Sequence, residues 1–272
     1  MSQNRSLLQL RRITKIFSKG TIDEVTALDS INLDVNAEDY ITIIGSNGAG
    51  KTTLLNIIAG VFPPERGGRV IVNGSDITGL SEYKHATYVG RVYQDPHIGT
   101  AAKMTIEENL AMAILRGQPR SLRPASNKQR GELFRLALSP LELGLEKRLS
   151  AQVGTLSSGQ RQAVALVMAT ISKPALLLLD EHTANLDPRT AQIVLNLTEM
   201  IVQREKMTTI MVTHNMELAL RYGNRLIMMH EGGIIVDLNQ EQRAGLTINN
   251  LINAFEKASG RTFDEDNALL TG

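Results

Sequence analysis

A glycine-rich loop with a lysine is the strongest chemical signal in this sequence. Residues 45–52 read GSNGAGKT, which matches the phosphate-binding pattern G-x-x-x-x-G-K-[ST]. Its glycines let the backbone curl with the N–H groups pointing inward. Lys51 would offer its charge to the β- and γ-phosphates of a nucleotide, and Thr52 a hydroxyl to Mg²⁺. A chance glycine-rich turn is the alternative. The candidate binding residues are Gly45, Ser46, Asn47, Gly48, Ala49, Gly50, Lys51, Thr52 and Thr53.

Two adjacent carboxylates would complete such a site. In LLLLDEHTANLD, residues 176–187, four leucines lead into Asp180 and Glu181. The leucines predict a strand buried on both faces of a parallel sheet, and such sheets bind ligands beyond the carboxyl ends of their strands. We expect Asp180 to hold Mg²⁺ through water, and Glu181 to orient and polarise the attacking water. The alternative is a solvated turn after the strand.

A third segment, TLSSGQRQ at 155–162, has the spacing of a helix start. Ser157 and Gln160 are three residues apart, as in a capping box, so Ser157 should cap a helix. The serine hydroxyl, the amide of Gly159 and the helix N-terminus could together bind a phosphate. Many helices begin in this way, so this segment alone is weak evidence for a phosphate site. It becomes strong evidence together with the glycine-rich loop and the two carboxylates.

The elements that must position these residues alternate between strands and helices. Strands are predicted at 6–17, 30–35, 40–45, 69–74, 175–179 and 208–213. Helices are predicted at 52–60, with Gly60 as C-cap, and at 191–203 and 248–258. A hairpin is expected around Gly232 and Gly233. This order predicts an α/β fold with a largely parallel sheet.

The region 95–165 differs in character and reads as a helical insertion. Thr105 and Glu108 fit a capping box, and helical patterns continue through 110–116 and 132–138. The basic, proline-containing link GQPRSLRPASNKQR separates these two patterns. The predicted division is a core in two parts, 1–94 and 166–238, around a helical subdomain at 95–165, followed by an extension at 239–272.

Composition restricts the classes of protein that remain. The chain has 272 residues and a formal net charge of +1, which gives no sign of a basic nucleic-acid surface. Cysteine is absent, which excludes disulfides and thiolate metal sites and suits a reducing compartment. The N-terminus lacks the apolar stretch of a signal peptide, and no apolar run approaches the roughly 20 residues of a membrane span. We therefore expect any membrane association to come through a partner.

Taken together, the motifs resemble those of the ATP-binding subunits of ABC transporters, over residues 7–238. GSNGAGKT resembles the Walker A motif, and LLLLDE the Walker B motif with its catalytic glutamate. LSSGQ is similar to the signature motif LSGGQ, with Ser158 in place of the first glycine. The resemblance implies a P-loop ATPase core with a mostly parallel sheet, an antiparallel β subdomain and an inserted helical subdomain.

The same resemblance implies roles for further residues. Gln94 in VYQDP is similar to the Q-loop glutamine, which touches Mg²⁺ or the lytic water. Residues 185–187 are similar to the D-loop, which crosses to a partner subunit. His214 in MVTHN resembles the switch histidine, which would hydrogen-bond the γ-phosphate and hold Glu181 in register. Phe17 takes the place of the aromatic residue that stacks on adenine, although a phenylalanine at a strand end is often a core residue.

The family's architecture implies a two-fold dimer around two ATP molecules with Mg²⁺. The second subunit would be another copy or a paralogous ATPase subunit, and it would contribute Ser157, Gly159 and Gln160 to the site. Separate permease subunits would hold the dimer at the cytoplasmic face of the inner membrane. Residues 161–190 and 211–235 resemble a bacterial importer group that works with a permease of the branched-chain amino acid type and an extracytoplasmic substrate-binding protein. Some members of that group are proposed to import aromatic amino acids.

Import of a small solute such as an amino acid is therefore the leading hypothesis. One alternative is the ATPase subunit of an exporter. Another is a soluble ABC ATPase that acts on ribosomes or DNA, although those usually carry tandem domains or a long coiled-coil insertion.

His182 departs from the family pattern, which commonly has proline after the catalytic glutamate. A cationic imidazole beside Glu181 would favour its carboxylate form. The alternative interpretation is a structural trait of a subgroup.

Overall fold

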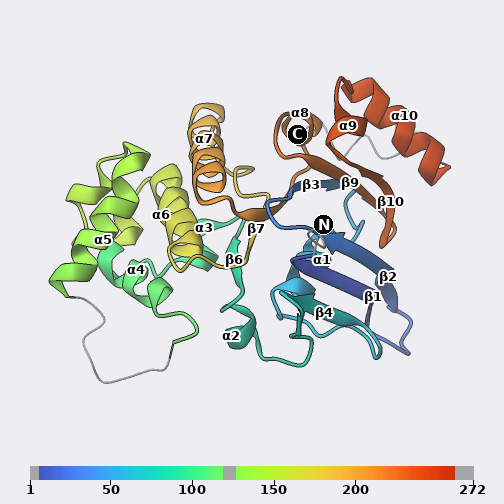
Figure 1. The fold of residues 1–272 in the computed structure, drawn as a ribbon, viewed down its shortest axis with the longest axis horizontal. Helices are drawn as coiled ribbons and strands as arrows, with labels where there is room; N and C mark the ends of the chain where they lie inside the picture. The colour runs from blue at the N-terminus through green and yellow to red at the C-terminus, as the bar shows by residue number, and fades with distance from the viewer. Residues whose placement is uncertain (1–5, 119–126, 261–272) are drawn as a thin grey trace, which may run out of the picture. The chain divides into compact units, whose positions relative to one another are not determined.

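The computed structural model describes residues 6–118 and 127–260, which form two compact units (Figure 1). The first unit comprises residues 1–85 and 207–272, and the second comprises residues 86–206. Most of the predicted basic link at 117–130 lies outside the described residues. In the described part of the chain, no helix is long and apolar enough to cross a membrane.

An antiparallel sheet opens the first unit, with the strand order β2-β1-β4-β5. Its strands are β1 (Leu8–Phe17), β2 (Val25–Val35), β4 (Arg69–Val72) and β5 (Ser75–Asp76). Leu8, Leu10 and Ile13 on β1 are fully buried. The strands predicted at 6–17, 30–35 and 69–74 are confirmed, and β2 begins earlier than predicted, at Val25.

The second sheet of the first unit carries its central parallel strands, in the order β10-β9-β3-β8. The strands are β3 (Tyr40–Gly45), β8 (Thr208–Val212), β9 (Arg225–His230) and β10 (Gly233–Leu238). β3 pairs in parallel with both β8 and β9, and every residue of β3 and β8 is buried. The predicted hairpin is confirmed, because β9 and β10 pair antiparallel across a turn at Gly232.

The helices of the first unit include the extension at the C-terminal end. They are α1 (Lys51–Ile58), α2 (Glu82–His85), α8 (Met216–Arg221), α9 (Gln240–Arg243) and α10 (Ile248–Ser259). The C-cap of α1 is Ala59, so the prediction of Gly60 at that position was wrong by one residue. α10 packs against β10 and α8 (Figure 1), and its Leu251 and Phe255 join the core formed by Ile44 and neighbouring apolar residues. The extension is thus part of the first unit's core as far as α10.

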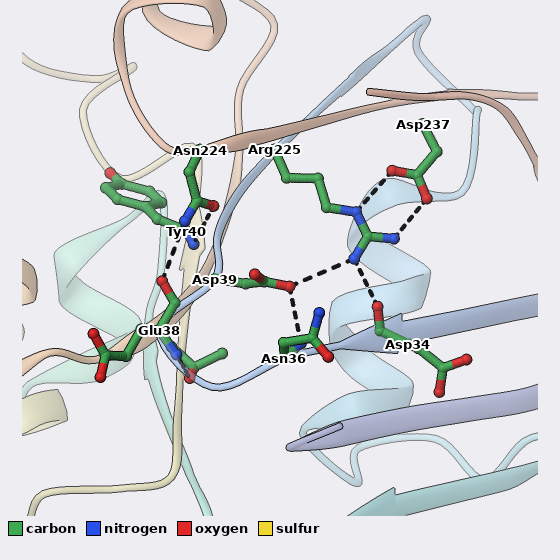
Figure 2. Close-up of polar contacts among 9 residues, drawn as sticks. Asp34, Asn36, Glu38, Asp39, Tyr40, Asn224, Arg225 and Asp237 are labelled. Carbon is green, nitrogen blue, oxygen red and sulfur yellow. Dashed lines mark hydrogen bonds and ion pairs between the residues drawn. The ribbon is translucent and has the colours of Figure 1, made fainter. Parts of the chain in front are cut away.

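Arg225 connects four strands next to the loop that leads into β3 (Figure 2). Its guanidinium forms two bonds to the Asp237 carboxylate, Nε–Oδ1 at 2.7 Å and Nη2–Oδ2 at 2.6 Å. Nη1 donates to the carbonyl of Asp34 at 2.7 Å and lies 3.5 Å from Oδ2 of Asp39, which also accepts from the backbone N–H of Asn36. Hydrogen bonding to Asp237 raises the pKa of Arg225 above its usual value. The network therefore ties the start of β3, and with it the loop beyond β3, to β2, β9 and β10.

Helices dominate the second unit. Its parallel strands are β6 (Val89–Val92) and β7 (Leu176–Asp180). Its helices are α3 (Pro96–Gly99), α4 (Ile106–Ile114), α5 (Lys128–Leu138), α6 (Ser158–Thr170) and α7 (Pro188–Glu205), with the 3-10 turns Ser139–Leu141, Leu145–Lys147 and Val153–Thr155. α6 lies at the centre and contacts α3, α4, α5, α7 and β6. The predicted Thr105–Glu108 capping box is confirmed at the start of α4.

Candidate nucleotide-binding site

The glycine-rich loop runs from the end of β3 to the start of α1. Gly45 and Gly50 have positive φ values of 155° and 93°. A Cβ atom on Gly45 would lie 2.1 Å from the carbonyl oxygen of Met229, and one on Gly50 would lie 2.3 Å from that of Ala27. Both positions therefore require glycine, for the backbone conformation and for the close approach of a neighbouring strand.

Lys51 folds back over this loop. Its side chain is buried, and Nζ donates to the carbonyl oxygens of Gly45 at 2.6 Å and Ser46 at 2.9 Å. A lysine ammonium has three donors and no acceptor, so it suits carbonyl and phosphate oxygens alike. Around Gly48, a Cβ atom would meet nothing within 4 Å, so the tip of the loop faces open space. Open space at a curled loop, a helix start capped by a bare glycine and a buried ammonium fit an anionic phosphate chain.

His214 lies at the same edge of the first unit's sheet as this loop. β3 and β8 are parallel neighbours, with Ile43 opposite Val212, and the loop and His214 follow directly after their carboxyl ends. His214 is half-buried, and the next residue, Asn215, caps α8. The structure thus brings together two predicted parts of the site that are far apart in the sequence.

Phe17, the predicted adenine platform, lies at the end of β1. Its ring is half-buried and meets the ring of Phe62 edge-on, with centroids 5.5 Å apart. The ammonium of Lys15 lies 5.5 Å from the centroid of Phe17. Phe17 is therefore not a fully buried core residue, and the stacking role stays a prediction.

A contact chain leads from the loop to the C-terminal helix. Oγ of Ser46 lies 3.5 Å from Nδ1 of His230 on β9, and the ring of His230 meets the ring of Phe255 on α10 edge-on at 5.2 Å. No local pattern in the sequence predicts this arrangement, because it depends on where the extension folds back.

The predicted carboxylates stand at the carboxyl end of β7 in the second unit. Every residue of β7 is buried, as the leucine run predicted, and Asp180 is its last residue. Oδ2 of Asp180 accepts a hydrogen bond from Nη2 of Arg91 on β6 at 2.7 Å. Glu181 is half-buried and has a left-handed φ of 45°, a conformation that non-glycine residues rarely adopt. A strained backbone at a candidate catalytic acid fixes the direction in which its side chain leaves the strand.

A carboxylate at this position is a suitable ligand for Mg²⁺, since this cation prefers oxygen ligands and is commonly held by one or two carboxylates together with water. The Arg91 contact was missed from the sequence. A charged residue inside the short apolar strand VGRV was a usable signal, because a buried guanidinium needs an acidic partner.

Gln94 lies at the same edge of the second unit as Asp180. It is exposed and follows β6, the parallel neighbour of β7. Beyond it, Asp95 caps α3, and His97 contacts the guanidinium of Arg161 on α6, with Nη1–Nε2 at 2.8 Å. The segment after Gln94 is therefore attached to the helix that starts with the signature motif.

That motif forms the predicted helix start. Ser157 caps α6, with its Oγ 3.3 Å from the N–H of Gln160, and the Gln160 side chain accepts in return from the N–H of Ser157. A Cβ atom on Gly159 would lie 2.1 Å from the methyl group of Thr190, so glycine is required there for packing against α7. Ser158 is the first helical residue and is exposed, so the motif accommodates it in place of glycine.

The segment similar to the D-loop runs from β7 to α7. Asn185 is exposed, and Asp187 caps α7 by accepting from the N–H of Thr190 at 3.1 Å. Hydrogen bonding from the Thr190 side chain, and then from its N–H, lowers the pKa of Asp187 below its usual value. Asp187 therefore stays ionised at the start of a helix, where negative charge is favourable.

His182 is a buried structural residue. Its side chain is 2% exposed, and Nε2 lies 3.0 Å from Oγ1 of Thr198 on α7. The Thr198 hydroxyl donates its one hydrogen to the carbonyl of Val194, so it must accept from His182, which places the imidazole proton on Nε2. Burial lowers the pKa of His182 to about 4. The imidazole is thus neutral at pH 7, and the interpretation of a cation acting on Glu181 was wrong.

This fold and these motifs define an ATP-binding cassette. Residues 28–184, more than half of the chain, match the ABC transporter family. The chain belongs to this family, and it is an ATPase subunit of an ABC transporter.

Particular relatives match most of its length. The chain is 40% identical over 252 residues to the tyrosine transport ATP-binding protein of Clostridioides difficile, covering 93% of this chain and 100% of that protein. It is 39% identical over 222 residues to the lipoprotein-releasing system ATP-binding protein LolD of Rickettsia typhi, covering 79% and 92%. A solved dimeric ATP-binding cassette in a post-hydrolysis state, bound to ADP and Pi, is similar with a TM-score of 0.72 and 26% identity, covering 86% and 98%.

Proposed function

We propose that this subunit powers the import of an aromatic amino acid, tyrosine being the first candidate, through separate permease subunits. The observation that carries the proposal is the 40% identity to a tyrosine transport ATP-binding protein over the whole of that protein's length. The match includes most of the chain and is not confined to the motifs that all ATPases of the family share.

In the proposed mechanism, the glycine-rich loop binds the phosphates of ATP. The loop amides and the helix start orient the phosphates. The ammonium of Lys51 exchanges its hydrogen bonds to the carbonyls of Gly45 and Ser46 for hydrogen bonds to phosphate oxygens. Phe17 would stack on the adenine. Mg²⁺, when bound, neutralises charge that develops on the phosphates. Thr52 and Asp180 would hold that ion, with Gln94 as a further ligand.

The hydrolytic step is assigned to Glu181. Its carboxylate would orient the attacking water and accept the proton on a carboxylate oxygen. His214 would hydrogen-bond the γ-phosphate and keep the water in place. The left-handed backbone at Glu181 and the capped helix after His214 both support this assignment, because they restrict the directions in which the two side chains can point.

The working unit is proposed to be a dimer closed by ATP. Ser157, Gly159 and Gln160 at the start of α6 would bind the γ-phosphate held by the other subunit, since a capped helix start attracts anions. Support comes from the similarity to a cassette solved as a dimer with ADP and Pi. Hydrolysis would remove the group that both subunits hold, and the dimer would open.

Membrane attachment would run through the permease. In the proposed division of the chain, the helical subdomain at 95–165 contacts the permease on the cytoplasmic face of the inner membrane. An extracytoplasmic binding protein would deliver the solute. The attachment of the segment after Gln94 to Arg161 supports a mechanical connection between nucleotide state and this subdomain.

Dimerisation is tested with Glu181→Gln, which should bind ATP and accumulate a closed dimer. Lys51→Ala is the matched control and should stay monomeric with ATP. Light scattering after gel filtration measures the mass, and phosphate release measures turnover. Normal steady-state hydrolysis by Glu181→Gln would refute the catalytic assignment.

Substrate and direction are tested by reconstitution. The subunit is co-purified with its permease, placed in vesicles with ATP on the side of the ATPase subunit, and supplied with labelled tyrosine and the binding protein on the other. ATP-dependent uptake that Lys51→Ala abolishes would support the proposal. Uptake of a different solute but not of tyrosine would reject tyrosine as the substrate and would still support import as the direction of transport.

Lipoprotein release is the second candidate, because the Rickettsia typhi relative is 39% identical over most of its length. The co-purifying membrane protein separates the two candidates. A permease that needs a binding protein supports import, whereas extraction of lipoproteins from the vesicles would favour release.

A further inference from the structure

Arg91 and Asp180 form a buried ion pair at the carboxylate assigned to the metal. Nη2 of Arg91 and Oδ2 of Asp180 are 2.7 Å apart, and their side chains are 8% and 10% exposed. Each charge loses hydration on burial, and each would be strongly destabilising without the other. A pair of this kind persists unless another charge replaces one member.

The strands keep the pair in place. Arg91 on β6 stands opposite Leu178 on β7, and Asp180 is two residues further along β7, so both side chains project from the same face. The guanidinium carbon of Arg91 also lies 4.5 Å from the centroid of the Tyr93 ring. Arg91 is thus held between a carboxylate and an aromatic face.

We propose that Arg91 is a positioning residue that weakens and thereby tunes metal binding at Asp180, because its guanidinium competes with the divalent cation for the carboxylate. The proposal rests on the proposed role of Asp180. A cation approaching Asp180 meets a carboxylate whose charge is already compensated, and it must either release the buried ion pair or bind beside a like charge.

The consequence is a site that holds the metal weakly until nucleotide phosphates contribute further negative charge. Once the phosphates leave, Arg91 recovers the carboxylate and favours release of the metal. Arg91 would therefore help to couple the metal cycle to the nucleotide cycle.

The test measures Mn²⁺ binding to the full chain saturated with ADP, by the electron paramagnetic resonance of free Mn²⁺. Arg91→Gln keeps an N–H donor and removes the charge, and it should bind Mn²⁺ about tenfold more tightly. Arg91→Lys keeps the charge and should stay within about twofold of the unmodified protein. Arg135→Gln removes an exposed arginine from the same unit and serves as the matched control.

Unchanged or weaker Mn²⁺ binding by Arg91→Gln would overturn the proposal. So would an equal gain in Arg91→Lys and Arg91→Gln, because the charge would then not be the cause. If Arg91→Gln does not fold, Arg91→Met, which keeps an apolar stem over Tyr93, replaces it with the same expected gain. Binding of a fluorescent ADP analogue is measured separately on the unmodified protein. Its absence would reject the nucleotide site itself, whereas ADP binding without a metal effect rejects only the role of Arg91.

Discussion

The neutral, buried imidazole of His182 makes a definite prediction about stability and pH. Its pKa is about 4 in the folded chain, against about 6.5 in an unfolded chain. Between these two values the unfolded chain binds a proton at His182 and the folded chain does not. The contribution is therefore fully present above pH 6.5 and is lost as the pH falls towards 4.

The magnitude follows from the same two values. Between pH 7.5 and pH 5, the linkage relation predicts a loss of about 2 kcal/mol in the free energy of unfolding from His182 alone. Most of this loss arises from protonation of the unfolded chain, since the folded chain stays largely unprotonated at pH 5. In the folded chain, protonation would place a charge in a site that is 2% exposed, where the imidazole hydrogen-bonds the hydroxyl of Thr198.

The assay is urea unfolding followed by circular dichroism at pH 7.5 and at pH 5, on the unmodified protein and on His182→Gln. Glutamine is neutral at both pH values and can donate to Thr198 through its amide. Other titratable groups act equally in both proteins, so the unmodified protein should lose about 2 kcal/mol more than the variant over this range. The same loss in both proteins, with equal m values, would refute the argument. The ATPase activity of His182→Pro, which carries the common family residue, should stay near normal, and a large loss of turnover with intact ATP binding would contradict the structural role.

Three further substitutions test the supports of the site. Gly50→Ala places a Cβ atom 2.3 Å from the carbonyl oxygen of Ala27. The affinity for a fluorescent nucleotide should therefore fall at least about tenfold, and the free energy of unfolding should fall by about 2 kcal/mol. Nucleotide binding like that of the unmodified protein would contradict this. Arg225→Met breaks the network of Figure 2 and should lower the free energy of unfolding by about 2 kcal/mol in urea titrations; no change would mean that solvent replaces these bonds. Phe255→Ala removes the α10 ring that packs on His230 and should lose about 3 kcal/mol, whereas a loss below 1 kcal/mol would show that α10 is not part of the core.

Features that depend on residues close in the sequence were predictable. The capping boxes at Thr105 and Ser157 were predicted correctly because both partners lie within one helical turn. The leucine strand before Asp180 was also correct, because complete burial on both faces demands an uninterrupted apolar run. The short helices around α2, α3 and α9 were not predicted, since a single turn leaves almost no periodic pattern.

Contacts between distant residues were not predictable in the same way. Arg91 and Asp180 become neighbours only because β6 and β7 pair, and His182 meets Thr198 only because α7 lies against the turn that follows β7. The left-handed backbone at Glu181 was not predictable either, because glutamate rarely adopts this conformation and its presence in a sequence does not indicate it. The C-terminal extension carries no motif in the sequence, and its place beside β10 depends on an apolar stripe that needs a partner surface.

The sequence by itself predicted a chemistry for this protein: a loop for phosphates, a carboxylate for a metal and another for water, because each motif is defined by residue types at short spacing. The tertiary structure decided the state of those groups. Strand pairing placed a guanidinium on Asp180, and helix packing enclosed His182 and held its pKa at about 4. Charge and hydration are properties of surroundings, and the surroundings of a buried group come from segments far away in the chain.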